Sequence, residues 1–206
     1  MNYETDAVIK QNIITTADGI RFHTSSHPYR IVTKIPEYQY GDIRSNDIVV
    51  DIGANAGAFA LRAARLSKTV VAVEPVTFDL LEANIRLNGA DIRIIRGALG
   101  DGRVAEIRWD ASAVILRTNP LSEIIGMAGG CDFLKCDAEG AEWKIRPEDL
   151  TGVRRIEMEL HMPPIGMPPE PALLEYIGRY YDFTIDRDPC HAPLGLFGFL
   201  HATRKT

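Results

Sequence analysis

One segment constrains the fold of this chain more than any other, and it reads VVDIGANAG over residues 49–57. Residues 48–52 are apolar except for Asp51, which is typical of a buried parallel strand that ends in a polar group. Gly53 and Gly57 then allow the backbone to turn sharply, and residues 58–66 carry apolar side chains at helical spacing. A buried strand, a tight turn and a helix in this order predict the start of a βαβ unit.

The same alternation of strands and helices continues to the end of the chain. It predicts an α/β fold with a doubly wound, mostly parallel sheet. We expect helices over residues 78–87, 121–127 and 172–181. We expect further strands over residues 69–73, 92–95, 104–109, 114–118, 132–136, 154–160, 183–186 and 196–202.

The first forty residues have a different pattern. Residues 12–16 and 20–24 are short strand-like runs on either side of Ala17-Asp18-Gly19, which is a hairpin signal. Residues 31–35 form another candidate strand. We therefore expect a small β extension over residues 1–40, packed on a main domain that covers residues 41–206.

Composition argues against two kinds of partner. The formal net charge is −5, and an acidic chain lacks the broad basic field that a nucleic-acid binder uses. Arg62, Arg65 and Lys68 are basic, but their helical spacing predicts a solvated helix face. The sequence contains no run of about 18 apolar residues, so it predicts no membrane-spanning helix. The N-terminus has no secretory signal pattern, and three sparse cysteines fit a reducing, cytoplasmic location.

The first candidate ligand-binding group is the turn after the strand at residues 48–52. In an open α/β sheet, ligands bind beyond the carboxyl ends of the strands. The carboxylate of Asp51 would repel a pyrophosphate there, but it would attract an ammonium group. The amino-acid end of S-adenosylmethionine carries both an ammonium and a carboxylate, which suit an acid beside a helix N-terminus. The glycines alone would indicate only a tight strand-to-helix turn.

The second group is Glu74, which ends the next strand and is followed by Pro75. An acid at this place can accept hydrogen bonds from both hydroxyls of a ribose. A nicotinamide enzyme would use the same acid, but its glycine signature is GxGxxG, whereas this chain has GxxxG. A dehydrogenase is therefore a minor alternative to a protein that binds S-adenosylmethionine.

The third group follows the strand at residues 132–136, within the sequence DFLKCDAEGAE. The strand delivers Asp137, Glu139 and Glu142 into a short loop at the ligand-binding edge of the sheet. Clustered carboxylates raise one another's pKa, which suits a general base. The structural alternative is a polar loop whose acids favour a helix N-terminus.

At this point the chain resembles a known family. The motifs VVDIGANAG, AVEP, GALGD and DFLKCDAEGAE, in this order and spacing, are similar to those of the FkbM-type methyltransferases, a group of class I S-adenosylmethionine-dependent methyltransferases. The resemblance covers roughly residues 47–159. The family usually has Val or a similar residue where Ala138 stands and Ile where Cys136 stands, and neither difference touches a charged position.

The resemblance implies a seven-stranded sheet whose last strand is antiparallel, and it implies O-methylation of a sugar or another small hydroxylated acceptor. The turn after the first strand would hold the methionyl end of the cofactor, Glu74 would bind the ribose, and residues 97–99 would flank the adenine. Asp137 would lie beside the transferring methyl group. The expected cofactor-binding residues are Asp51, Gly53, Ala54, Asn55, Gly57, Glu74, Pro75, Ala98, Leu99 and Asp137.

A hydroxyl acceptor must lose a proton during methyl transfer. The candidates for this catalytic role are Asp137, Glu139, Glu142 and His161, of which His161 ends the strand at residues 154–160. A histidine can accept a proton near neutral pH, which suits a catalytic role for His161. A structural role, with the ring hydrogen-bonded to backbone at the strand end, explains its position equally well. The three acids also offer hard oxygen ligands that suit Mg²⁺, although nothing in the sequence requires a metal.

The acceptor pocket is expected beneath the N-terminal extension and the proline-rich residues 162–171, with Tyr38, Tyr40, Trp109 and Trp143 as candidate lining residues. Two alternatives to a small-molecule O-methyltransferase stay open. A nucleic-acid methyltransferase would need a basic stripe near the site, which the acidic balance opposes. A non-catalytic S-adenosylmethionine-binding protein is opposed by the presence of Asp51, Glu74 and Asp137, since all the expected polar groups are there.

Overall fold

The computed structural model describes residues 8–10, 12–24, 35–187, 190 and 192–206. The candidate strand at residues 31–35 lies outside the described residues, apart from Ile35. Within the described chain, no helix combines the length and the apolar character that crossing a membrane requires.

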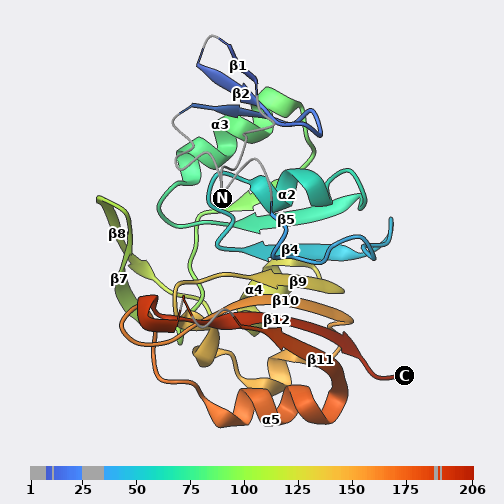
Figure 1. Cartoon of the computed structure of the whole chain (residues 1–206), viewed down its shortest axis with the longest axis vertical. Coiled ribbons are helices and arrows are strands. Elements are labelled where there is room, and N and C mark those ends of the chain that lie inside the picture. The colour runs from blue at the N-terminus through green and yellow to red at the C-terminus, as the bar shows by residue number, and fades with distance from the viewer. Residues whose placement is uncertain (1–7, 11, 25–34, 188–189, 191) are drawn as a thin grey trace.

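A seven-stranded sheet forms the centre of the molecule (Figure 1), and its strand order is β11-β12-β10-β9-β4-β5-β6. β12 runs antiparallel to both of its neighbours, and the other adjacent pairs are parallel. This confirms the predicted doubly wound α/β sheet with an antiparallel last strand. The strands are β4 (Ile48–Ile52), β5 (Thr69–Val73), β6 (Arg93–Ile95), β9 (Phe133–Cys136), β10 (Arg155–His161), β11 (Tyr181–Asp186) and β12 (Leu196–Arg204).

Helices cover both faces of the sheet, and each face has its own apolar core. Val49 and Phe133 pack with α2 and α3, while Val50 and Leu134 pack with α4 and α5 on the other side. Neighbouring residues of β4 and β9 point to opposite faces, so both strands are apolar throughout except for Asp51 and Lys135. The helical segments are α2 (Ala58–Ala63), α3 (Phe78–Asn88), α4 (Leu121–Ala128), α5 (Pro171–Tyr180), η1 (Ala141–Lys144), η2 (Pro147–Leu150) and η3 (Ala192–Leu194).

Two predicted elements differ in detail from the structure. The helix expected over residues 58–66 ends at Ala63, because the amides of Arg65 and Leu66 bond to carbonyls three residues back and tighten the last turn. The strands expected over residues 104–109 and 114–118 are β7 (Val104–Trp109) and β8 (Ser112–Arg117). They pair only with each other, as a ribbon beside the main sheet (Figure 1).

The N-terminal extension is a three-stranded antiparallel sheet of β1 (Val8–Lys10), β2 (Ile13–Thr15) and β3 (Arg21–His23). The predicted hairpin between β2 and β3 is confirmed, whereas β1 was not expected. The hairpin bonds to α3, because the amide of His23 donates to Oδ1 of Asn84 over 2.9 Å.

The extension also corrects one expectation from the sequence. Arg62 does not lie on a solvated helix face, since its side chain is only 5% exposed and its Nε is 2.9 Å from Oδ2 of Asp18 in the β2–β3 turn. Arg65, which is half exposed, donates to the carbonyl oxygen of Asp18. The two arginines therefore hold the N-terminal sheet against α2.

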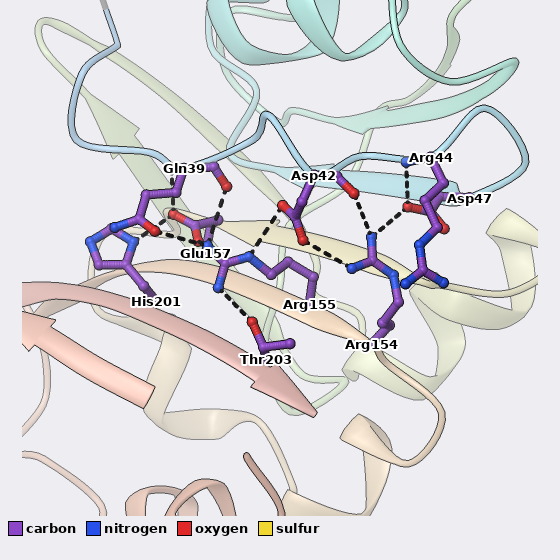
Figure 2. A network of polar contacts seen from close by, with 9 residues as sticks. All are labelled: Gln39, Asp42, Arg44, Asp47, Arg154, Arg155, Glu157, His201 and Thr203. Carbon is purple, nitrogen blue, oxygen red and sulfur yellow. Dashed lines mark hydrogen bonds and ion pairs between the residues drawn. The ribbon is translucent and has the colours of Figure 1, made fainter. Parts of the chain in front are cut away.

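Residues 35–47 cross the sheet above β10 and β12 and are fixed there by a polar network (Figure 2). Oε2 of Glu157 accepts from the amide of Gln39 and contacts Nδ1 of His201, both over 2.7 Å. Arg154 donates to Asp42 over 2.9 Å and to Asp47 over 2.7 Å. This anchoring keeps the start of the segment over the carboxyl end of β10.

Candidate active site

Two cavities meet at the carboxyl ends of β4, β5 and β9, where the topology of an open sheet places its ligands. The first cavity lies between the loops that follow β4, β5, β6 and β9, with the tip of β7 as one wall. Its lining residues are Ile52, Gly53, Asn55, Glu74, Pro75, Val76, Gly97, Ala98, Leu99, Ile107, Arg108, Trp109, Asp137, Ala138, Glu139 and Ala141.

The second cavity lies under residues 35–38 and is bounded by α2 and by the ends of β10 and β12. Its floor is charged, with Glu37, Lys135, Glu159 and His161, and its walls include Phe59 and Phe199. Five residues line both cavities: Gly53, Asn55, Trp109, Asp137 and Glu139. This shared wall is the place where a group held in one cavity reaches a molecule held in the other.

The turn after β4 has the shape that the glycine pattern predicted. Gly53 has φ 72°, and a Cβ added there would lie 1.7 Å from the carbonyl oxygen of Asp137, so only glycine fits. Asn55 also has a positive φ, of 49°. The β4 and β9 loops therefore touch backbone to backbone at the shared wall.

Glu74 organises the first cavity from the end of β5. Its Oε2 accepts from the amide of Asn55 over 2.9 Å, and its Oε1 accepts from the amides of Val76 and Thr77 over 2.7 and 2.9 Å. The side chain is 5% exposed and lines the first cavity. Three bonds from backbone to one carboxylate fix the two loops relative to each other.

Asp51 and Lys135 form a buried ion pair beneath the shared wall. Nζ of Lys135 lies 3.2 Å from Oδ1 of Asp51, and the two side chains are 5% and 0% exposed. Burial raises the pKa of Asp51, against the opposing effect of Lys135. Burial alone would lower the pKa of Lys135, but the charges of Asp51 and Asp137 outweigh it and raise that pKa above its usual value.

The structure brings most of the expected cofactor-binding residues to the cavities. Gly53, Asn55, Glu74, Pro75, Ala98, Leu99 and Asp137 line the first cavity, and Ala54 lines the second. Gly57, with φ 92°, is the N-cap residue of α2 and lines neither. Asp51 also lines neither, and the ammonium group beside its carboxylate belongs to Lys135. A direct contact between Asp51 and a ligand stays a prediction.

Asp137 is the central acid of the site. Its Oδ2 accepts from the hydroxyl of Tyr38 over 3.2 Å and lies 3.8 Å from Nζ of Lys135. The same hydroxyl lies 3.2 Å from Oε2 of Glu159. Burial and the charges of Glu159 and Glu139 hold the pKa of Asp137 well above its usual value. A carboxylate with a raised pKa is a better proton acceptor than an exposed one.

His161 lies beside this acid, at the end of β10, and its ring faces three carboxylates. Nε2 is 3.5 Å from Oε2 of Glu139 and 3.4 Å from Oε1 of Glu159, and Nδ1 is 3.4 Å from Oε1 of Glu142. Burial alone would lower the pKa of His161, but Glu142 and Glu159 raise it to about 11. In this arrangement the imidazole is already protonated at neutral pH, so it holds no free site for another proton.

Glu142 does not face either cavity. Its side chain is 0% exposed, and its two oxygens accept from the amides of Ala138 and Gly140 over 2.5 and 2.9 Å. The carboxylate therefore closes the loop after β9 and supports His161 from behind. Glu139 lies on the cavity side of the same loop, with a φ of 51° that is rare for glutamate.

Comparisons with known proteins agree with this geometry. A family model described as the TRM5/TYW2 methyltransferase domain matches residues 40–124, which is less than half of the chain. A search of curated proteins gives no match. The matched model is a different one from the FkbM-type family that the motifs resemble, so that finer assignment stays a prediction.

Solved structures of other proteins are similar to this chain. An rRNA methylase from Streptococcus thermophilus is 12% identical, with a TM-score of 0.53 over 89% of this chain and 96% of that chain. A fibrillarin/Nop5p complex is 15% identical, with a TM-score of 0.51 over 79% of this chain and 74% of that one. A dimethyladenosine transferase from Plasmodium falciparum is 14% identical, with a TM-score of 0.47. The match covers 79% of this chain but only 57% of the length of the transferase.

The chain is an S-adenosylmethionine-dependent methyltransferase. Its sheet is the Rossmann-like sheet of the class I enzymes, with the antiparallel strand inserted second from one edge. The residues that match the methyltransferase domain contain β4, β5 and Glu74. The loops that follow these two strands line the first cavity, so the matched residues and the cavity lie in the same part of the chain.

Several residues of this methyltransferase site were not found from the sequence. Lys135 was not assigned a role, because a single lysine in an apolar strand gives no signal of its partner across the sheet. Glu37 and Glu159 line the second cavity, but only the crossing of residues 35–47 brings them together. Of the four aromatic candidates, Tyr38 and Trp109 line that cavity. Trp143 and Tyr40 line neither cavity.

Proposed function

We propose that this methyltransferase transfers a methyl group from S-adenosylmethionine to a hydroxyl oxygen of a small, polyhydroxylated acceptor, of which a sugar is the leading example. The observation that supports this most directly is the position of Asp137. It lies on the wall shared by the two cavities, and its raised pKa suits removal of a proton from a hydroxyl group.

The first cavity fits the cofactor by its residues. Glu74 offers carboxylate oxygens to the ribose hydroxyls, Ala98 and Leu99 offer an apolar wall to the adenine, and Gly53 leaves room for close backbone approach. When bound, S-adenosylmethionine supplies an electrophilic methyl group on a sulfonium. Residues at the shared wall, with Asn55 and Asp137 among them, would orient its methionyl end toward the second cavity.

The second cavity is where the acceptor would bind. The hydroxyl group would face Asp137, which accepts its proton as the oxygen forms a bond to the methyl carbon and the carbon–sulfur bond breaks. Tyr38 donates to Asp137 and lies equally close to Glu159, so it orients the base. Holding the oxygen and the methyl carbon in line is the larger part of the catalysis that a protein can supply here.

An RNA acceptor is the alternative that the comparisons raise, because one neighbour of similar fold is named an rRNA methylase. The acidic floor of the second cavity argues against it. Glu37, Asp137, Glu139 and Glu159 line the cavity, and carboxylates repel a phosphate backbone. We also propose membership in the FkbM-type family, which the position of the DFLKCDAEGAE loop at the shared wall supports.

Two measurements test this proposal. Isothermal titration of S-adenosylhomocysteine into the full chain should show binding by the wild type and by Asp137→Asn. Transfer of radiolabelled methyl groups should then be screened over sugars, other small hydroxylated metabolites and RNA. We expect transfer to a small acceptor by the wild type, with a loss of roughly 100-fold or more in Asp137→Asn. Transfer to RNA alone, or a fully active Asp137→Asn, would overturn the proposal. The matched control is Asp91→Asn, which changes an acid on an exposed loop in the same way and should keep the wild-type rate.

A further inference from the structure

Three side chains at the shared wall present ligand atoms to one point. A carboxylate oxygen of Asp137, a carboxylate oxygen of Glu139 and a ring nitrogen of His161 all lie within 4.8 Å of one another. A metal ion with bonds of about 2.1 Å and octahedral geometry holds its ligands roughly 3.0 to 4.2 Å apart. The three groups therefore need a small contraction to bind one ion, and His161 must release its Nε2 proton as the ion binds.

The surroundings of His161 have the form of a metal-bound histidine. The side chain is buried, with 3% exposed, and its Nδ1 faces the carboxylate of Glu142. Nε2 is the nitrogen that faces Glu139 and Glu159 on the cavity side. In metal sites, the ring nitrogen away from the metal almost always donates to a carboxylate or another fixed acceptor.

Glu142 fits the role of that fixed acceptor. Its Oε1 lies 3.4 Å from Nδ1 of His161, and backbone amides hold the carboxylate in place. Glu142 is also fully buried and lines neither cavity. A carboxylate placed in this way orients an imidazole and fixes which of its nitrogens is free.

The balance of charge at this place favours a cation. Glu139, Glu142 and Glu159 each lie within 3.5 Å of a ring nitrogen of His161, and an oxygen of Asp137 lies within 4.8 Å of one. Lys135 lies closer to Asp51 than to Asp137. A divalent ion would replace the repulsion among these acids with attraction, since carboxylates this close to one another cannot all ionise freely.

We propose that Asp137, Glu139 and His161 form a binding site for one divalent metal ion at the wall between the two cavities. The mixed nitrogen and oxygen ligands suit Mn²⁺ better than Mg²⁺. Binding of the ion does not depend on the identity of the acceptor. Its role rests on the proposed function: an ion at this place would coordinate the acceptor hydroxyl and make its proton easier for the site to accept.

The test of the site is a titration of Mn²⁺ into the full chain. Calorimetry measures the heat of binding, and electron paramagnetic resonance measures the free ion. We expect one ion per chain. We expect Glu139→Gln and His161→Gln each to weaken the affinity at least 10-fold, since each removes one of three protein ligands. Glu175→Gln, an exposed position on α5, should bind as the wild type does. Thermal unfolding of each variant without metal shows that it is folded.

Three results would overturn the inference: no Mn²⁺ binding by the wild type, unchanged affinity in both ligand variants, or equal loss in Glu175→Gln. A separate experiment tests the proposed function, by measuring methyl transfer after the metal has been removed with EDTA. Transfer that persists at full rate without bound metal would overturn the role of the ion in methyl transfer, while the Mn²⁺ titration alone decides whether the binding site exists. Metal binding by a chain that methylates RNA but no small acceptor would sink the proposed acceptor alone.

Discussion

Nζ of Lys135 lies 3.2 Å from Oδ1 of Asp51, and the two residues stand opposite each other on the adjacent strands β9 and β4. Lys135 also donates to the carbonyl oxygen of Gly53 over 3.0 Å, while neither oxygen of Asp51 has a hydrogen bond within the described chain. One ammonium group therefore links the end of β4 to the glycine turn at the shared wall. The charge of each residue depends on the other.

Lys135→Met should destabilise the protein by about 3 to 5 kcal/mol, because it leaves the buried carboxylate of Asp51 without its partner. Replacing both charges, in Asp51→Leu/Lys135→Met, should recover much of that loss, since paired apolar residues of similar volume often match a buried ion pair. Urea unfolding of the single and double variants gives the coupling free energy. Additive effects in the double variant would show that the two residues do not act as a pair.

Glu74→Ala should weaken binding of S-adenosylhomocysteine at least 10-fold, about 1.4 kcal/mol. It removes the acceptor for the amides of Asn55, Val76 and Thr77, so we also expect a loss of roughly 1 to 3 kcal/mol in stability. Glu74→Gln keeps one oxygen that can accept these bonds, so its ligand affinity and its stability should lie between those of the wild type and those of Glu74→Ala.

Glu82→Ala is the matched control for this experiment. Glu82 lies on α3 and pairs with Arg86 on the surface of that helix, where such a pair contributes about 0.3 to 0.5 kcal/mol. Calorimetry of the ligand and thermal unfolding should both leave this variant near the wild type. Unchanged ligand affinity in Glu74→Ala would contradict the placement of the ribose at this acid.

Tyr38→Phe should lower the rate of methyl transfer by roughly 10- to 100-fold, because the base would lose the hydroxyl that orients it. Binding of S-adenosylhomocysteine should change little, since Tyr38 lines the second cavity and not the first. Tyr40→Phe is the control, as both rings pack on Phe59, with centroids 6.0 and 5.8 Å away. Equal rates in the two variants would remove Tyr38 from the proposed mechanism.

The sheet and the cofactor cavity were predictable because their determinants are local. The apolar strand, the glycines and the acid at the strand end lie within short stretches, as in Val49–Gly57 and at Glu74, and parallel strands bring their carboxyl ends together by topology alone. The ends of β4 and β9 meet for this reason, and Ile52 is paired with Cys136.

The acceptor side was less predictable because it depends on contacts between distant segments. Tyr38 meets Asp137 and Glu159 only because residues 35–47 cross the sheet. The bond from the amide of Gln39 to Glu157 that helps to fix this crossing leaves no periodic pattern in the sequence (Figure 2). Glu142 looked equivalent to Glu139 in the loop sequence. A φ of 51° at Glu139 and the amide bonds to Glu142 separate them, with one facing the cavity and the other buried behind His161.

Asp18→Asn should loosen the N-terminal sheet in a way that depends on pH. Partial burial alone would raise the pKa of Asp18, but the Thr16 hydroxyl and the charges of Arg62 and Arg65 lower it below the usual value of 3.8. A carboxylate whose pKa is lower in the folded state stabilises the protein above its unfolded pKa, and this contribution disappears as pH falls through the folded pKa. The variant should therefore lose about 0.5 to 1 kcal/mol at pH 7, and the difference from the wild type should shrink below about pH 3.8. Urea unfolding at pH 7 and at pH 3 measures both values, and an equal loss at the two pH values would show that the charge of Asp18 does not hold the hairpin to Arg62.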